Sequence, residues 1–260
     1  MADYEASTYG ERIADAYDEL VPPHVAATTE ASVDFLASVA KRPRALELGI
    51  GTGRIAIPLS ERGFEVSGID ASPAMVERLR AKKGGAAIPV EIGDFGDVKI
   101  NRRFPLIYVA FNTFFALLTQ DAQVRCFVRV ARRLTSDGVF VMSVFVPDLS
   151  RFDGGQRVGV TRVGLDAVNL EATQHDPAAQ TVTSAHVVIS ERGVRFYPVK
   201  LRYAFPSELD LMARLAGMRL RERFGGWRRE SFGPSSVTHV SVYELDSVAA
   251  ATSRRTRKRA

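Results

Sequence analysis

The sequence predicts an α/β fold in which a doubly wound, mainly parallel sheet of seven strands carries an inserted antiparallel β meander. Up to Pro147, short apolar strands alternate with helical runs, and this alternation is typical of a parallel sheet covered by helices. From about Arg151 to Phe205 there is no helical run. Short alternating segments separated by turn residues replace it, which indicates an antiparallel meander.

The individual elements follow from local patterns. The expected core helices cover Arg54 to Arg62, Ser72 to Lys83, Asp121 to Leu134 and Pro206 to Ala216. Ser72-Pro73 is typical of a helix start, because a hydroxyl can cap the helix and proline suits its first turn. Val139 to Phe145 is apolar on both faces, as in a central strand covered by helices. The expected meander strands cover Val158 to Val163, Val168 to Thr173, Thr181 to Ser190 and Val194 to Ala204.

The chain is expected to divide into four parts. An N-terminal helical cap covers residues 1–42, with two helices joined at Val21-Pro22-Pro23 and one apolar face along Glu11 to Leu20. The core covers 43–150 and 204–246, and the β-insertion covers 151–203, where it forms a lid or a dimer surface. Residues 247–260 are expected to be a disordered basic tail.

Composition limits the function classes. Five basic residues between Arg254 and Arg259 account for the formal net charge of +5, so the remainder is formally neutral. Nucleic-acid binding needs a basic footprint on a folded face, and none is expected here. No apolar stretch is long enough to cross a bilayer, so no membrane partner is expected. The lone Cys126 and the absence of a basic-then-apolar secretory leader favour a cytoplasmic location.

The run from Arg44 to Ala56 reads as a strand that ends in Glu47 and then a glycine turn into a helix. Gly49, Gly51 and Gly53 can take positive φ, and without Cβ atoms they let a ligand approach the backbone. Phe64 to Asp70 is a second strand ending in an acid, and a carboxylate there can accept hydrogen bonds from ribose hydroxyls. Together these strands predict a pocket for a cofactor that contains adenosine.

The identity of that cofactor depends on Glu47. Gly51 to Ala56 fits the looser dinucleotide pattern G-x-G-x-x-A, so an NAD-dependent oxidoreductase is an alternative. However, Glu47 would bring negative charge close to a diphosphate, which is unfavourable in a partly dry site. A carboxylate suits a cofactor with a positive end. The pattern Glu47-x-Gly49-x-Gly51-x-Gly53 resembles the first motif of class I S-adenosylmethionine-dependent methyltransferases.

The resemblance is clear over about residues 40 to 147 and implies a Rossmann-like fold with S-adenosyl-L-methionine as cofactor. It implies that Asp94 accepts from the adenine amino group, that Phe95 packs near the ring, and that the N-terminal segment closes over the cofactor. The expected cofactor-binding residues are Tyr9, Tyr17, Glu47, Gly49, Gly51, Gly53, Arg54, Asp70, Ala71, Met75, Asp94, Phe95, Ala110 and Asn112.

The acceptor is harder to predict, because the sulfonium activates the methyl group and the enzyme mainly aligns the acceptor and excludes water. The candidate catalytic residues are Tyr9, Asn112, Trp227 and His239. His175 and His186 could reach the pocket if the insertion is a lid. The four histidines have no ligand spacing, so no metal is expected. Phe111-Asn112-Thr113-Phe114 lacks the Asn/Asp-Pro-Pro-aromatic motif of enzymes that methylate nucleic-acid amines, so no nucleic-acid partner is expected.

The layout is similar to small-molecule methyltransferases, among them nucleotide-linked amino-sugar and glycine-type N-methyltransferases. We therefore expect methyl transfer to N or O of a small molecule, such as a specialised metabolite, by a chain that can dimerise through the β-insertion. Three alternatives stay open: the NAD-dependent oxidoreductase, an RNA or protein methyltransferase recruited by the basic tail, and a non-catalytic cofactor-binding module.

Overall fold

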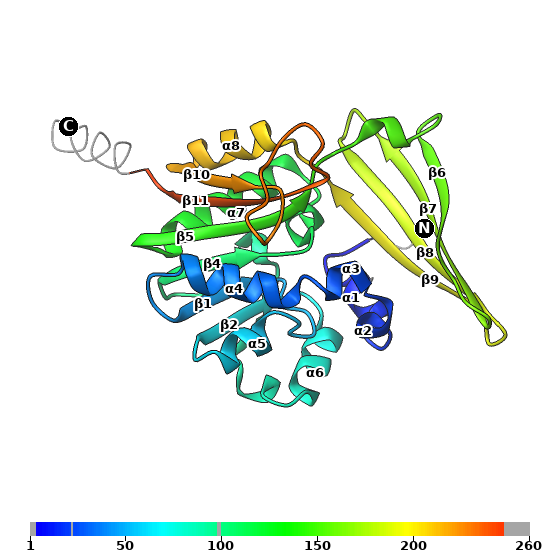
Figure 1. Cartoon of the computed structure of the whole chain (residues 1–260), viewed down its shortest axis with the longest axis horizontal. Coiled ribbons are helices and arrows are strands. Elements are labelled where there is room, and N and C mark those ends of the chain that lie inside the picture. The colour runs from blue at the N-terminus through cyan, green and yellow to red at the C-terminus, as the bar shows by residue number, and fades with distance from the viewer. Residues whose placement is uncertain (1–3, 22, 98–99, 247–260) are drawn as a thin grey trace.

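The protein contains two β-sheets that meet at one end of the molecule (Figure 1). The computed structural model describes residues 4–21, 23–97 and 100–246. Sheet A has seven strands in the order β10-β11-β5-β4-β1-β2-β3, and sheet B has four in the order β6-β7-β8-β9. The expected basic tail, 247–260, and Pro22 of the expected helix junction lie outside the described residues.

The strands of sheet A confirm the predicted mainly parallel sheet: β1, β2, β3, β4 and β5 pair in parallel, and β11 pairs antiparallel with both neighbours. All six residues of β4 are buried, as expected for a central strand covered on both faces. The bounds are β1 Arg44–Leu48, β2 Glu65–Asp70, β3 Val90–Ile92, β4 Phe104–Val109, β5 Leu134–Phe145, β10 Met218–Phe224 and β11 Thr238–Leu245. β5 begins earlier than predicted, because Leu134 already pairs with Phe104.

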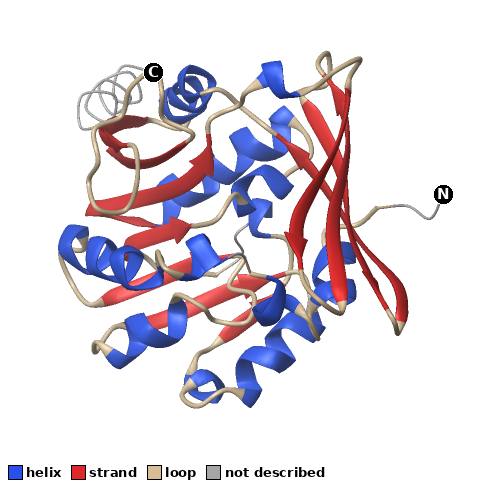
Figure 2. Cartoon of the chain, turned by 45° about the vertical axis from the view of Figure 1, so that its right-hand side comes forward, coloured by secondary structure: helices blue, strands red, loops and turns tan. Residues whose placement is uncertain are grey.

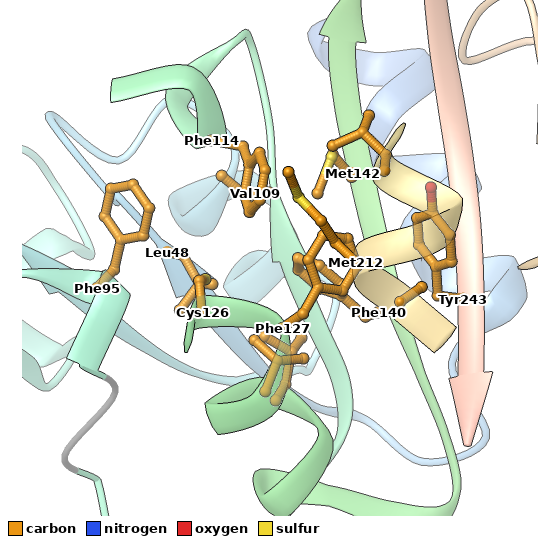
Figure 3. Packing of buried hydrophobic residues seen from close by; sticks show 14 of the residues in the cluster. Leu48, Phe95, Val109, Phe114, Cys126, Phe127, Phe140, Met142, Met212 and Tyr243 are labelled. Carbon is orange, nitrogen blue, oxygen red and sulfur yellow. The ribbon is translucent and has the colours of Figure 1, made fainter. Parts of the chain in front are cut away.

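Helices cover both faces of sheet A (Figure 2). One buried cluster joins α7 and α8 to the sheet; Figure 3 shows Phe127, Met212 and Tyr243 packed within it. The other cluster joins α4, α5 and Leu79 of α6 to the opposite face. The bounds are α4 Thr29–Val39, α5 Ala56–Glu61, α6 Pro73–Ala81, α7 Gln120–Arg133 and α8 Pro206–Leu215, with short 3-10 helices η1 Gly85–Ala87, η2 Phe95–Asp97, η3 Thr113–Ala116 and η4 Leu149–Arg151.

The start of α6 agrees with the sequence, since the Ser72 hydroxyl accepts a 3.2 Å hydrogen bond from the Met75 amide. Thr119 caps α7 in the same way, through a 3.1 Å bond from the Ala122 amide. Side-chain caps replace the partners that the first amides of a helix lack. Both helices therefore begin where their own sequences supply a hydroxyl.

The N-terminal segment differs from the prediction. The single helix expected over Glu11 to Leu20 is wrong: α1 Thr8–Ile13 ends, the chain turns through a 2.8 Å bond from the Ala16 amide to the Ile13 carbonyl, and α2 Tyr17–Leu20 follows. α3 covers Pro23–Ala26.

Hydrogen bonds fix these short helices over the core. The Glu11 carboxylate accepts from the Ser72 hydroxyl at 2.7 Å and from the Ala74 amide at 3.1 Å, and the Thr52 hydroxyl donates to Asp18 at 2.8 Å. α1 can approach Ser72 this closely because Gly10 faces it: a Cβ there would lie 2.5 Å from the Ser72 Cβ. The segment therefore covers the ends of β1 and β2.

Sheet B is the predicted antiparallel meander. Its strands are β6 Gln156–Val163, β7 Ala167–Asp176, β8 Thr181–Ser190 and β9 Gly193–Arg202, and each pairs antiparallel with the next. Because side chains alternate between faces, the register defines two surfaces. The inner face is turned toward α1, and the outer face is turned away from sheet A (Figure 2).

A buried polar cluster, here called the joint, connects sheet B to the core. Arg202 at the end of β9 donates to Gln123 of α7 at 2.6 Å and to Glu208 of α8 at 2.8 Å. Gln180 accepts from Arg202 at 3.1 Å and donates to Glu208 at 3.0 Å. The joint therefore links the insertion to the first turns of two core helices.

Candidate active site

A cavity of about 820 Å³ lies between the carboxyl ends of the parallel strands and the inner face of sheet B. Ligands of open α/β sheets bind at these strand ends, where the strand order reverses. Here the order reverses at β1, between β4 and β2. The core side of the cavity is lined by Gly49, Gly51, Asp70, Ala71, Ser72, Met75, Asp94, Phe95, Asn112 and Thr113.

The turn after β1 brings backbone to the cavity. Gly49, Gly51 and Gly53 all have positive φ, and the amides of Gly49 and Ile50 both donate to the Ile69 carbonyl at the end of β2. A Cβ on Gly51 would meet only the Met75 Cε, at 3.3 Å. The Gly51 backbone is therefore open on its cavity side. Gly53 does not line the cavity and lies against Ile57 and Leu79.

Glu47 is a buried carboxyl beside this turn. It accepts a 2.9 Å hydrogen bond from the Tyr108 hydroxyl, and burial raises its pKa to about 8 against the opposing effects of Tyr108 and Arg54. A small adjoining cavity is lined by Glu47 together with Tyr17, Arg54 and Ala110. The Arg54 guanidinium lies 5.2 Å from the centre of the Phe111 ring. Glu47 is thus a buried carboxyl that burial keeps largely protonated and that a positively charged ligand would ionise.

Asp70 ends β2 with both oxygens already held. Oδ2 accepts from the Gly51 amide at 2.7 Å and Oδ1 from the Ser72 amide at 2.9 Å. Burial raises the pKa of this carboxyl, and the amide bonds oppose the rise. Each carboxylate oxygen has a second lone pair, so the carboxylate can still accept two hydroxyl donors from the cavity.

Asp94 and Phe95 follow β3 at the far end of the core side. Asp94 is exposed and accepts from the Gly96 amide at 2.7 Å, whereas Phe95 is buried. Both line the cavity together with Ala71 and Met75. The Asp94 acceptor and the Phe95 ring thus lie at the end of β3. Asp70 at the end of β2 lies between them and Glu47 of β1 in the strand order of sheet A.

Tyr9 of α1 and Tyr17 of α2 line the cavity on the side of the N-terminal segment. Burial raises the pKa of Tyr9, and it also raises the pKa of Tyr17, which hydrogen-bonds Arg54. Both hydroxyls therefore stay protonated at neutral pH. Tyr4, which the sequence did not single out, lines the same wall.

Asn112 sits at the end of β4 with φ 66°. Its Oδ1 accepts from the Phe145 amide at 2.7 Å and its own amide donates to the Ser143 carbonyl at 3.0 Å. The residue therefore holds the carboxyl ends of β4 and β5 together. Its side-chain amide group is left as a donor toward the cavity, which Asn112 lines.

Similarity to known proteins agrees with this arrangement. The family model described as a methyltransferase domain matches residues 45–138. The CcbJ methyltransferase from Streptomyces caelestis is 40% identical, with 93% of this chain and 99% of that chain covered and a TM-score of 0.87. The chain belongs to the class I S-adenosylmethionine-dependent methyltransferases.

Two further similarities extend over most of the chain. The cypemycin N-terminal methyltransferase of a Streptomyces species is 26% identical, over 92% of this chain and 98% of its own length. The sugar N-methyltransferase KedS8 from a Streptoalloteichus species is 19% identical, with 94% and 96% of the two chains covered and a TM-score of 0.67. The latter shows the fold alone. The predicted family and fold class of this methyltransferase are confirmed.

Two candidate catalytic residues of the methyltransferase lie away from the cavity. Trp227 packs edge-to-face on Phe35 of α4, with ring centres 5.6 Å apart. His239 is buried in β11, where Nδ1 pairs with the Ser241 hydroxyl at 2.8 Å. Burial lowers the pKa of His239 to about 3, so it is neutral at physiological pH. The loop and strand patterns that suggested these residues do not specify on which side of sheet A they fall.

Sheet B supplies a cavity wall that sequence reasoning largely missed. Of its two histidines, His186 lines the cavity, whereas His175 Nε2 lies 2.9 Å from the hydroxyl of Tyr203, itself a lining residue. The further lining residues from sheet B are Thr161, Glu171, Thr173, Val182, Ser184, Val199 and Leu201. Alternation could have indicated that every second residue shares a face, but not which face meets the core.

In the part of the chain that the structure describes, no group of three or more His, Cys, Asp or Glu side chains is placed to hold a metal ion. Over the same residues, no helix is long and apolar enough to cross a membrane. Cys126 is buried in α7, and burial raises its pKa. This thiol is therefore a core residue.

Proposed function

We propose that this methyltransferase binds S-adenosylmethionine and transfers its methyl group to a nitrogen or oxygen of a small molecule. The observation that carries the proposal is that one cavity joins the glycine turn and Asp70 to the inner face of sheet B. Cofactor and acceptor can therefore share one space, as direct methyl transfer requires.

The described residues fit this cofactor. The buried carboxyl of Glu47 suits its positively charged end, the free lone pairs of Asp70 suit ribose hydroxyls, and Asp94 with Phe95 suits adenine. Gly51 leaves room for a ligand against the backbone. A diphosphate would instead keep the Glu47 carboxyl protonated and find no opposite charge in it, which disfavours NAD.

The cofactor supplies a methyl group already activated on a sulfonium, so the chain's own residues need only orient the acceptor and exclude water. The protonated hydroxyls of Tyr9 and Tyr17 line the cavity from the N-terminal segment. The side-chain amide of Asn112 is a donor from the loop after β4. We assign these three side chains to holding the acceptor atom. Nitrogen is favoured over oxygen, because an amine has to lose only the proton of its ammonium form before it attacks, and that proton is far more acidic than the proton of an alcohol.

The cypemycin relative supports nitrogen as acceptor, since it is an N-terminal methyltransferase. A small amine, such as one in a specialised metabolite, is therefore the proposed acceptor. A cytoplasmic location, expected from the lone cysteine, stays a prediction.

We also propose that the chain forms a homodimer through the outer face of sheet B. Val158, Val160, Val163, Val194 and Phe196 of this face are each more than half exposed. The register places them beside Leu170 and Val187 without an intervening charge. Homodimer interfaces are more apolar than the rest of a surface, so an identical face is a suitable partner.

Calorimetric titration of the full chain with S-adenosylmethionine, S-adenosylhomocysteine and NAD tests the cofactor. Binding of the first two and not of NAD is expected, and the reverse would make the protein an oxidoreductase. Release of S-adenosylhomocysteine with small amines in the assay would establish transfer. A chain lacking residues 247–260 should retain that activity; its loss would favour an RNA or protein acceptor recruited by the tail.

Analytical ultracentrifugation tests the dimer. Phe196→Glu should convert a dimer to a monomer, whereas Val237→Glu, at a still more exposed apolar position on the core, should not. A monomeric wild-type chain would contradict the proposal.

A further inference from the structure

The inner face of sheet B presents a polar pair to the acceptor side of the cavity. Glu171 of β7 and His186 of β8 lie directly opposite each other in the register, and both line the cavity. Side chains of opposed residues in an antiparallel pair are close enough to share one ligand.

Glu171 differs from the other carboxylates that line this cavity. Asp70, Asp94 and Asp148 each accept a hydrogen bond from a nearby backbone amide. Within the described residues, no hydrogen bond or ion pair joins the Glu171 carboxylate to another side chain or to the backbone. The half-buried Glu171 carboxylate can therefore accept a donor from a ligand in place of water.

The neighbouring groups do not fill this role. The hydroxyls of Thr173 and Ser184 bond each other at 3.0 Å, and the Thr161 hydroxyl donates to the Asn169 carbonyl at 3.1 Å. The Arg151 guanidinium, also on the cavity wall, lies 5.9 Å from the centre of the Phe152 ring. On the same face, the Arg157 guanidinium lies over Gly159, the register partner of Glu171 on β6, without an ion pair to Glu171. Among the described residues, the side chains of Glu171 and His186 have no hydrogen bond or ion pair and can meet a ligand beside Arg151.

We infer that Glu171 is a specificity-determining residue that binds an ammonium group of the acceptor, with His186 beside it on the same face. The inference rests on the proposed function and narrows its substrate class to amines that carry a positive charge when they bind. Val182, Leu201 and Phe152, which line the same cavity further along the inner face beside His175, are apolar, so they suit a ligand with an apolar body.

This assignment disfavours an acceptor linked to a nucleoside diphosphate. Such an acceptor brings at least two negative charges, and among the described residues that line the acceptor side Arg151 is the one guanidinium, against the carboxylates of Asp148 and Glu171. Like charges in a partly dry cavity repel strongly. The acceptor of this chain therefore differs from the nucleotide-linked amino sugars to which its layout is similar.

Ligand-observed NMR titration of the full chain with S-adenosylhomocysteine present tests the inference at pH 7. The probes are benzylamine, which is an ammonium at this pH, benzyl alcohol as its neutral analogue, and thymidine diphosphate. The wild-type chain should bind benzylamine more tightly than the other two. Glu171→Gln should weaken benzylamine about tenfold, as expected for a charge-assisted contact, and leave benzyl alcohol unchanged.

Two variants control for structure. Glu191→Gln, at an exposed carboxylate in the β8–β9 turn, should change nothing, and Glu171→Asp should restore part of the benzylamine affinity. The inference is overturned if Glu171→Gln leaves benzylamine unchanged, if both benzyl probes weaken equally, if the wild-type chain does not prefer benzylamine, or if thymidine diphosphate binds more tightly. S-adenosylhomocysteine affinity is measured separately. If the wild-type chain does not bind S-adenosylhomocysteine, the proposed function is overturned and the inference with it. If it binds S-adenosylhomocysteine but Glu171→Gln leaves the benzylamine affinity unchanged, the inference alone is overturned.

Discussion

The two walls of the cavity are built in different ways. On the core wall, Asp70 is held by the amides of Gly51 and Ser72, and Glu47 is held by Tyr108. On the sheet B wall, Glu171 and His186 have no such partners within the described residues. A wall whose polar groups are already oriented suits a ligand of fixed structure, whereas free polar groups gain most from the ligand that they select. The difference assigns the cofactor to the first wall and selectivity to the second.

The strongest way to break this comparison is to block the core wall. Gly51→Val adds a branched side chain at φ 54° on the open side of the turn, where such residues are rarely tolerated. S-adenosylhomocysteine binding measured by calorimetry should become undetectable. Gly217→Val, which has a similar φ of 72° with open space around it, controls for backbone strain and should bind normally. Retained binding in the Gly51 variant would contradict the turn assignment.

The second test removes Arg202, the side chain of the joint that connects sheet B to the two core helices. Arg202→Leu leaves Glu208 and Gln123 without their shared cation and should lower the free energy of unfolding by about 3 kcal/mol, the lower end for a broken buried pair. Urea unfolding measures this change. Arg219→Leu removes an exposed pair with Glu244 and should cost less than about 1 kcal/mol. Equal effects of the two variants would mean that the joint contributes no more than a surface pair.

The third test sharpens the role of Asp70. Asp70→Asn keeps the side-chain shape but removes the charge, so cofactor affinity should fall by about 1.5–3 kcal/mol, as for hydrogen bonds to a charged group. Isothermal titration with S-adenosylhomocysteine measures the change. The exposed Asp34, which pairs with Arg62, provides the control Asp34→Asn. Unchanged affinity in the Asp70 variant would remove this residue from the site.

The fourth test concerns the charge of Glu47. With its pKa raised to about 8, the carboxyl is mostly protonated at pH 7 in the free protein. The positive end of S-adenosylmethionine would lower that pKa, so binding should release up to about one proton. Affinity should therefore rise as the pH increases from 6 to 8. Calorimetry in two buffers with different ionisation enthalpies measures the release, and Glu47→Gln should abolish it. Equal heats for the wild-type chain in both buffers would contradict the model.

The smallest effect is expected away from both walls. His239→Leu removes a neutral imidazole whose Nε2 has no hydrogen-bond partner among the described residues. Affinity for S-adenosylhomocysteine and the rate of its release with an amine acceptor should stay within about twofold of wild type, because the imidazole does not reach the cavity. A large loss of rate with normal cofactor affinity would return His239 to the candidate catalytic residues.

The sequence by itself determined the core of this protein. The strand-turn-helix from Arg44 to Ala56, the acid after β2 and the capped start of α6 are local patterns, in which a few neighbouring residues fix the backbone through their own hydrogen bonds. The family, the seven-stranded sheet and the meander could therefore be predicted. The turn between α1 and α2 could not, because it depends on contacts of Glu11 and Asp18 with Ser72 and Thr52, far along the chain.

Only the tertiary structure decided which face of sheet B meets the core. Hydrophobic patterning alone would turn Val158, Val160 and Phe196 inward, yet these side chains face outward and Glu171 and His186 line the cavity. The physical reason is that an alternating strand specifies two faces but not their partners. The partner was chosen by long-range contacts: Arg202 of β9 with α7 and α8, and α1 packed against β9. These contacts placed an unpaired carboxylate in the cavity, a position that strand patterning could not supply.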